Sequence, residues 1–353
     1  MRKLDNYIAR TVIGAVAMVL LVLVALDAIS ALVDQLGEIK GSYDFNEALI
    51  YVCLTLPERI YSNLPFSALV GSLIGLGILA GSSELVVMRA AGISVNRITW
   101  SVLQPALLFI LLGIGLGEFV IPVSEQMADS RRAIAQGDSR ALGSRHGLWS
   151  REDNEFLHIN AVLPNGRLYG VTRFRFDTEG HLQVSSFAQS AIFQGDHWRE
   201  EEVQESVLAK DSVTSNRYTS RRWESDLSPQ ILSVLILDPE TLSIRDLRSY
   251  ARFLQQQGLE SSKYLLTFWK KMLQPLATIS LVLIAVSFVF GPLRQVTMGF
   301  RIFTGVIVGI VFQTSQDMLG PASLVYGFPP LVAVIIPIML CIVIGVVLLR
   351  RAG

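Results

Sequence analysis

Residues 82–96 read SSELVVMRAAGISVN and lie between two long apolar runs, Leu64 to Ala80 and Ile98 to Val120. Charged and polar residues alternate with apolar ones in this stretch, which predicts a short helix with an apolar stripe and charged flanks. A membrane protein that only anchored itself would need just a polar turn between two spans. A helix that lies against a membrane can serve as a docking surface for another protein. The segment therefore favours a chain that works with a separate partner.

The composition is that of a membrane protein. Of the 353 residues, 51% are hydrophobic and only 17% are charged, with a mean hydropathy of +0.46. Soluble domains carry about 25% charged residues. The formal net charge is zero, so nothing in the charge balance indicates nucleic-acid binding. The only cysteines, Cys53 and Cys341, lie in or beside apolar runs, which excludes a disulfide framework in the polar part and predicts packing roles.

Six segments are long enough to cross about 30 Å of hydrocarbon. The first follows Arg2, Lys3 and Arg10; a cleaved signal peptide is the alternative there, but apolar character continues through Val33, which favours an uncleaved helix. Basic residues of the short connections fall on one side, so both termini are predicted to be cytoplasmic. The predicted spans are Thr11–Val33, Asn63–Ala80, Arg97–Val120, Met272–Phe290, Ile302–Met318 and Phe328–Leu349, the second extended outward through 50–56 and interrupted at Pro57.

A long polar insertion separates the third and fourth spans and is predicted to lie outside the membrane. Alternation predicts strands at 168–176, 182–187, 203–208 and 212–223, with a hairpin turn at Asn165-Gly166. Each strand exposes a polar face, which predicts an antiparallel sheet, sandwich or jelly roll. Residues 242–257 return to helical spacing, and Gly258 supplies a stop. The expected division is 1–123 for spans one to three, 124–262 for a β jelly-roll domain with its connecting helix, and 263–353 for spans four to six.

No pattern in the chain indicates catalysis. The sequence has no G-x-x-x-x-G-K-[ST] loop for ATP phosphates and no G-x-S-x-G nucleophile motif, and its four histidines lack metal-ligand spacing. Neither an enzyme activity nor a bound cofactor is therefore expected. Four carboxylates lie near span ends, where interfacial solvation is favoured over proton relay and where the glycine context of an intramembrane aspartyl protease is missing. They are Asp27, Asp34, Glu118 and Asp317.

Other residues within the spans suggest packing or lipid contact. Pairs of glycines four apart, such as Gly71 and Gly75, predict close helix packing. Lys40 and Arg59 near the outer membrane face could hold the phosphates of an anionic lipid, with ordinary interfacial anchoring as the alternative. Phe66 and Phe312 could line an apolar cavity for acyl chains, or could equally face lipid. The candidate lipid-binding set is Asp27, Lys40, Arg59, Phe66, Phe312 and Gln316.

Three stretches carry a resemblance to a known family. Residues 83–92, SELVVMRAAG, resemble the cytoplasmic coupling helix of the lipopolysaccharide-export permeases, the LptF/LptG family. Residues 290–294, FGPLR, are similar to the end of that family's fourth helix, and Gly320-Pro321 with 324–330, LVYGFPP, resembles its turn between helices five and six. The order of three helices, external β domain and three helices covers the whole chain.

The resemblance implies a transport subunit that extracts lipopolysaccharide from the outer leaflet of the inner membrane, with no ATP site of its own. It implies a second, LptF-like permease as heterodimer partner, two copies of a cytoplasmic LptB-like ATPase that bind ATP, a single-helix LptC-like protein and an LptA-like periplasmic bridge. The ATPase would dock on the matching residues Ser83, Glu84, Leu85, Val87, Met88, Arg89 and Gly92. The chain departs from the family near the outer end of helix one, where Ala31, Gly37 and Glu38 stand and only Lys40 is basic.

Two other classes of function remain as alternatives. A non-transporting scaffold would use the β domain to bind an envelope-assembly partner and would not co-purify with an ATPase. An intramembrane hydrolase would lose its activity on replacement of Asp27 or Asp317.

Overall fold

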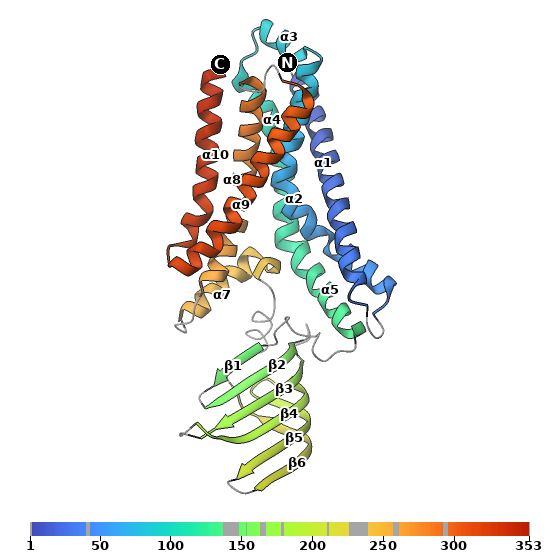
Figure 1. Ribbon diagram of the computed structural model, residues 1–353, viewed down its shortest axis with the longest axis vertical. Coiled ribbons are helices and arrows are strands. Elements are labelled where there is room, and N and C mark those ends of the chain that lie inside the picture. Colours follow the sequence, from blue (N-terminus) through green and yellow to red (C-terminus); the bar gives the residue numbers. More distant parts are fainter. Residues whose placement is uncertain are drawn as a thin grey trace. The chain divides into compact units, whose positions relative to one another are not determined.

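The computed structural model describes residues 2–39, 43–136, 148–152, 154–162, 167–177, 180–209, 212–225, 239–256, 261–291 and 296–352. Figure 1 shows its helices and strands. The chain divides into two compact units: residues 1–30, 56–122 and 242–353 form the first, and residues 31–55 and 123–241 form the second.

Six helices within the described residues are long and apolar enough to cross a membrane, which confirms the predicted number and order of spans. They are α1 (Arg2–Leu36), α2 (Phe45–Gly81), α4 (Val95–Gly115) continued by a π-helical turn η1 (Leu116–Val120) and α5 (Ile121–Gln136), α8 (Ser262–Phe290), α9 (Met298–Tyr326) and α10 (Pro330–Ala352). Two shorter helices, α3 (Glu84–Ala90) and α7 (Ile244–Gln256), and the 3-10 turn η2 (Pro239–Thr241) complete the helical part.

The helices are longer than hydropathy alone predicts. The second span begins at Phe45, and the interruption predicted at Pro57 is wrong because Pro57 and Pro65 both lie inside a continuous α2. A proline within a membrane helix is tolerated where neighbouring helices and side chains satisfy the freed backbone groups. A hydropathy pattern detects only the apolar centre of each helix. The helical hydrogen bonds continue into the polar ends, so the helices extend beyond the predicted spans.

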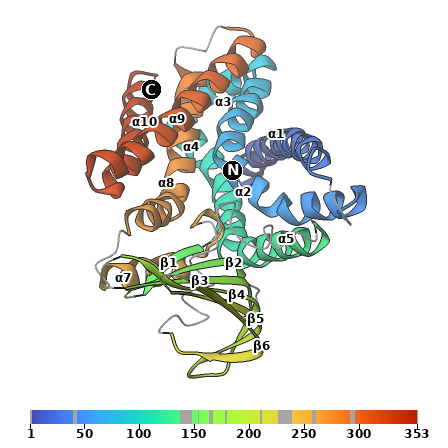
Figure 2. The same ribbon diagram turned by 60° about the horizontal axis from the view of Figure 1, so that its bottom comes forward.

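Small residues set the close packing of the helices, as the glycine spacing predicted. A Cβ built on Gly71 of α2 would overlap the backbone of Val16 of α1, lying 2.7 Å from its nitrogen, and one on Gly75 would lie 3.0 Å from the Cα of Val12. On α9, a Cβ at Gly309 would meet the ring of Phe66 at 2.5 Å. Such contacts let helices approach where the lipid supplies no hydrophobic driving force. Figure 2 shows α8, α9 and α10 side by side, and α8 packs on both of its neighbours and on α4.

The β part is an antiparallel sheet, as predicted. Its described strands follow one another across the sheet in chain order, so consecutive hairpins build a meander, and no Greek-key crossing of the jelly-roll type occurs among them. The strands are β1 (Leu148–Glu152), β2 (Glu155–Val162), β3 (Leu168–Phe176), β4 (Leu182–Phe193), β5 (Trp198–Ala209) and β6 (Ser212–Trp223). The predicted strands 168–176 and 212–223 are confirmed, β4 and β5 are longer than predicted, and the predicted turn at Asn165-Gly166 and stop at Gly258 lie outside the described residues.

Strict alternation along the third strand is wrong at one point. Leu168 and Val171 are both buried although they are three apart, because Gly170 between them adopts a φ of 62°. Glu202 on β5 has a φ of 51°, and the paired rows skip both residues. The face of the sheet to which side chains point therefore changes at Gly170 because of its backbone conformation. A period-two sequence pattern does not reveal such a change.

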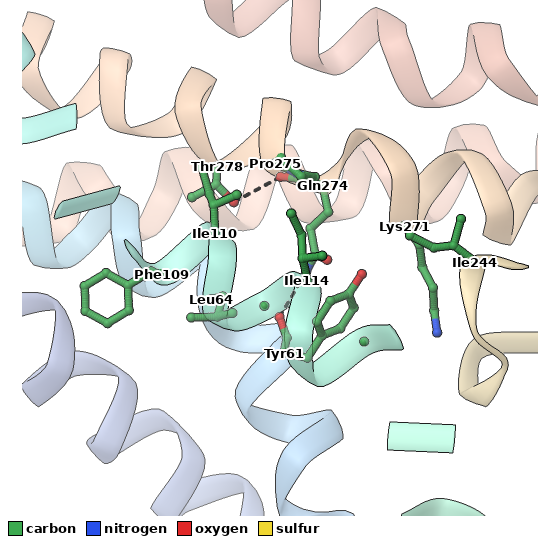
Figure 3. A pocket seen from close by; sticks show the side chains of 12 residues that line it. Tyr61, Leu64, Phe109, Ile110, Ile114, Ile244, Lys271, Gln274, Pro275 and Thr278 are labelled. Carbon is green, nitrogen blue, oxygen red and sulfur yellow. Dashed lines mark hydrogen bonds between the residues drawn. The ribbon is translucent and has the colours of Figure 1, made fainter. Parts of the chain in front are cut away.

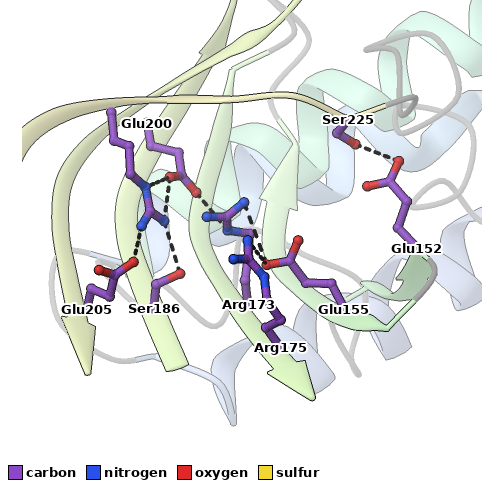
Figure 4. A network of polar contacts seen from close by, with 9 residues as sticks. Glu152, Glu155, Arg173, Arg175, Ser186, Glu200, Glu205 and Ser225 are labelled. Atoms are coloured by element: carbon purple, nitrogen blue, oxygen red, sulfur yellow. Dashed lines mark hydrogen bonds and ion pairs between the residues drawn. The ribbon is translucent and has the colours of Figure 1, made fainter. Parts of the chain in front are cut away.

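A network of charges lies among the buried side chains of the sheet (Figure 4). Glu200 is 1% exposed and sits between the guanidinium groups of Arg173 at 3.2 Å and Arg221 at 2.8 Å. Arg221 also pairs with Glu205, and Arg173 lies 3.7 Å from Glu155. Burial lowers the pKa of Arg173 from its ordinary value, whereas Glu200 and Glu205 outweigh burial and raise the pKa of Arg221.

Candidate functional site

A defined helix stands within the segment predicted to dock a partner. The carbonyl of Ser83, which has a φ of 62°, accepts hydrogen bonds from the amides of Val86 and Val87 at 3.1 Å each. At the other end Gly92 has a φ of 83°, and the amides of Gly92 and Ile93 donate to the carbonyls of Arg89 and Met88. This is the Schellman arrangement, which favours glycine at the left-handed position. The sequence therefore builds a rigid helical turn here in place of a loose connection.

The two faces of α3 differ, and the difference separates the predicted docking residues. Leu85 and Met88 are buried in the helix core, with exposures of 5% and 7%. Val86 and Val87 stand on the opposite side and are 55% and 66% exposed. Burying Leu85 and Met88 fixes α3 to its own chain, so the surface that α3 offers to another protein is the side of Val86 and Val87.

Polar contacts join α3 and its neighbourhood to the first span. The carboxylate of Glu84 accepts hydrogen bonds from the hydroxyl of Tyr7 at 3.3 Å and from that of Ser82 at 2.9 Å. Nearby on α1, Asp5 forms an ion pair with Arg97 of α4 at 3.0 Å. Figure 1 shows α3 and both termini at the same end of the helix bundle. A movement of α3 would therefore shift α1 through the Tyr7–Glu84 bond, and α1 is joined in turn to α4 by the Asp5–Arg97 pair.

The structure brings two of the candidate lipid-binding residues together. Asp27 of α1 accepts a hydrogen bond on its carboxylate from the amide of Asn63 of α2, at 2.6 Å. Arg59, one turn earlier on α2, donates to the backbone carbonyl of Asp27 at 3.3 Å. All three side chains are half-buried. We call Asp27, Arg59 and Asn63 the α1–α2 polar cluster; it places one carboxylate, one guanidinium and one amide between two membrane helices.

The other candidate lipid residues lie apart from this cluster. Lys40 falls outside the described residues. Phe66 packs where Gly309 leaves room on α9, and Phe312 is buried in the helix core. Gln316 is half-buried on α9, beside Asp317, which lies 3.9 Å from Lys270. The acyl-cavity role predicted for the two phenylalanines stays a prediction.

A pocket in the first unit lies between α2, α4 and α8, next to the start of α7 (Figure 3). Its wall is mostly apolar, with room for about one water molecule. The ammonium group of Lys271, only 7% exposed, donates to the carbonyl of Leu242 at 2.6 Å and lies 5.8 Å from the ring centre of Tyr61. Gln274 donates to the carbonyl of Tyr61 at 3.0 Å. These bonds hold α8 to α2 and to the chain entering α7.

Sequence reasoning missed the role of Glu118. Its carboxylate accepts a hydrogen bond from the amide of Ile244 at 3.0 Å and pairs with Arg245 at 3.0 Å, so it caps the start of α7. Glu118 lies in the π-helical turn η1 and is 11% exposed. Glu118 was predicted to be solvated at the membrane interface, but its carboxylate instead binds the start of α7. Ile244 lies 126 positions further along the chain, so no local sequence pattern could indicate this contact.

Tyr7 and Asn63 were also missed, since neither carries a local motif. A candidate metal site formed by three or more histidine, cysteine or acidic side chains is not found within the described part of the chain.

Six apolar spans, an antiparallel β domain between the third and fourth, and the short helix α3 define a multi-span membrane protein with a separate β domain. The family model for the lipopolysaccharide export system permease LptF/LptG matches residues 6–351. The lipopolysaccharide export system permease protein LptG of Escherichia coli K12 is 38% identical over 352 residues, covering 99% of this chain and 98% of that protein. LptG of Haemophilus influenzae is 37% identical with the same coverage.

The chain belongs to the LptF/LptG family of lipopolysaccharide export permeases. This confirms the resemblance drawn from the three sequence stretches. The six spans and the family together indicate a protein of the inner membrane.

Proposed function

We propose that this chain is one half of a permease that extracts lipopolysaccharide from the outer leaflet of the inner membrane. A separate cytoplasmic ATPase would supply the energy, with two copies bound below the permease pair. An LptF-like chain would form the other half, an LptC-like helix would regulate the gate, and an LptA-like bridge would receive the lipid. The termini would lie in the cytoplasm and the β domain in the periplasm. ATP would be bound by the partner alone.

The observation that carries this proposal is the two-sided α3. A docking helix must be exposed on one side and held firmly on the other, or the force applied to it would be lost in local motion. Val86 and Val87 meet the first requirement, and the burial of Leu85 and Met88 meets the second. The bond from Tyr7 to Glu84 adds a direct connection to the first span.

The α1–α2 polar cluster supports a role for α1 in handling a charged lipid. A carboxylate within a membrane segment is costly unless it is paired, and Asp27 is paired with the amide of Asn63. In this cluster Arg59 is the group able to contact a lipid phosphate, while Asp27 and Asn63 hold the two helices together at that level. Because Arg59 donates to the backbone of α1, moving α1 would shift this cation, which on this proposal contacts the lipid phosphate.

Replacement of Glu84 by lysine tests the coupling role. The substitution breaks the bonds to Tyr7 and Ser82 and reverses the charge beside the docking face. ATP-driven release of lipopolysaccharide from proteoliposomes that hold the whole complex should fall at least tenfold, while the chain still inserts and pairs with its permease partner. The matched control is Glu224→Lys, a charge reversal at a side chain 79% exposed in the second unit, which should leave release unchanged. Normal release and normal ATPase binding in the Glu84 variant would contradict the proposal.

A further inference from the structure

Six side chains form a single row across the sheet. The strand register pairs each with the next, so that every strand contributes one member. With strands about 4.8 Å apart, the row is roughly 24 Å long. Its members, in order from β1 to β6, are Trp149, His158, Thr172, Phe187, Gln204 and Arg217.

The row lies on the exposed face of the sheet. Trp149 is 59% exposed and Phe187 is 40% exposed, and Gln204 and Arg217 are also exposed. The residues before His158 and Phe187 on their strands, Leu157 and Ser186, are buried, as expected when successive side chains point to opposite faces. We call this row the aromatic–polar row.

Its aromatic end is ordered. The ring of Trp149 lies 4.6 Å from that of His158, and it stacks at 13° on Phe174 with the ring centres 6.3 Å apart. Phe156 and Phe174 stand in the adjoining row of the same face, which continues through Ser185, Ser206 and Ser215. The face therefore offers flat rings at one end and hydroxyl, amide and guanidinium groups toward the other.

Within the row itself, the only charged side chain at neutral pH apart from histidine is Arg217. The aromatic–polar row contains no carboxylate, and no ion pair of Arg217 occurs among the described residues. The acidic side chains Glu155, Glu200 and Glu205 are instead held by arginines in the network on the opposite side of the sheet. An anionic ligand seated along the row would meet the guanidinium group of Arg217, while the exposed Glu202, two residues from Gln204 on β5, lies outside the row.

We propose that the aromatic–polar row binds the phosphorylated oligosaccharide of the lipopolysaccharide. Sugar rings present apolar C–H faces that stack on aromatic rings, and their hydroxyls pair with the side chains that follow along the row. The strand spacing is close to the length of one pyranose ring, so successive sugars meet successive strands. An acyl chain would leave the histidine, threonine, glutamine and arginine unpaired. The inference rests on the proposed export of lipopolysaccharide and adds a second contact, to the sugar end of the same substrate.

Binding of the delipidated core oligosaccharide to the purified permease complex in nanodiscs tests the proposal. Calorimetry should give about tenfold weaker binding for Trp149→Ala and for Arg217→Gln, the loss expected for one stacked ring or one charge-assisted bond. Trp149→Phe should retain most of the affinity because it keeps a flat ring. The matched control Arg222→Gln, at an arginine 58% exposed on the same strand, should bind like the unmodified complex.

Equal binding by the unmodified complex, Trp149→Ala and Arg217→Gln, or no binding at all, would overturn the proposal. An equal loss in Arg222→Gln would overturn it too, since bulk positive charge would then explain the binding. Lipopolysaccharide release from proteoliposomes, measured on the same samples, separates this inference from the function it rests on. If release is normal and the Trp149 and Arg217 variants bind the oligosaccharide as well as the unmodified complex, only the binding proposal for the row is contradicted. If the unmodified complex does not release lipopolysaccharide, the export proposal is contradicted, and the binding data are then judged separately.

Discussion

Replacing Gly71 by alanine should disrupt the seam between α1 and α2. The added Cβ would overlap the backbone of Val16, which cannot rotate away as a side chain could. Overpacking of this kind costs about 1–3 kcal/mol, and an obstructing backbone places the cost toward the upper end. Alanine also favours the helix over glycine by about 1 kcal/mol, which partly offsets the strain.

A matched variant removes the helix-propensity contribution from the comparison. Gly14 lies on α1, and a Cβ built there meets nothing within 4 Å. The difference between Gly71→Ala and Gly14→Ala therefore measures the strain alone. At roughly 2–4 °C per kcal/mol, the Gly71 variant should melt about 2–12 °C below the Gly14 variant in detergent, with Gly75→Ala between them. Equal melting temperatures for the Gly71 and Gly14 variants would refute the close approach of α1 to α2.

Three further substitutions probe other parts of the chain. Glu118→Ala removes the bond to the amide of Ile244 at the start of α7, where Ser243 still accepts from the amide of Asp246, at a cost toward the lower end of about 0.5–2 kcal/mol. Hydrogen exchange at Ile244 should accelerate, while Glu118→Gln keeps most of the protection. Glu200→Gln removes the carboxylate between Arg173 and Arg221, each of which keeps a second acidic partner. The stability lost in denaturant unfolding of the full chain should therefore stay below the roughly 3–5 kcal/mol of a fully unpaired buried charge, yet exceed the loss at exposed Glu224. A smaller loss than at Glu224 would argue against the network. The hydrogen bond from Ser190 and the charge of Arg167 lower the pKa of Glu201, so its stabilising effect is present above pH 4.5 and lost as the pH falls below that value. Glu201→Gln should flatten the acid limb of the melting curve.

Much of the fold follows from local patterns. Apolar runs predicted the number and order of the spans, and alternation predicted the sheet, because burial in lipid and burial on one face of a sheet leave periodic signals. Helix ends were less predictable. Pro57 was expected to interrupt α2, but a helix in a membrane keeps its backbone bonds wherever neighbours can support it.

The site was only partly predictable for a different physical reason. The sequence pointed to α3, because a charged amphipathic segment between two spans is visible locally. It could not show that Leu85 and Met88 face inward and Val87 outward, since the amphipathic pattern does not say which side another part of the chain covers. The pairing of Asp27 with Asn63 joins residues 36 apart on different helices, and a single sequence carries no record of such a contact.

Site-specific photo-crosslinking at Val87 tests most directly whether energy enters this permease through α3. The probe would be placed at Val87, 66% exposed on α3, and at Tyr326, 81% exposed at the end of α9, in cells that produce the whole complex. The proposed docking predicts capture of the cytoplasmic ATPase from position 87 and not from position 326. Capture from position 326 alone, or capture of periplasmic proteins from position 87, would contradict it.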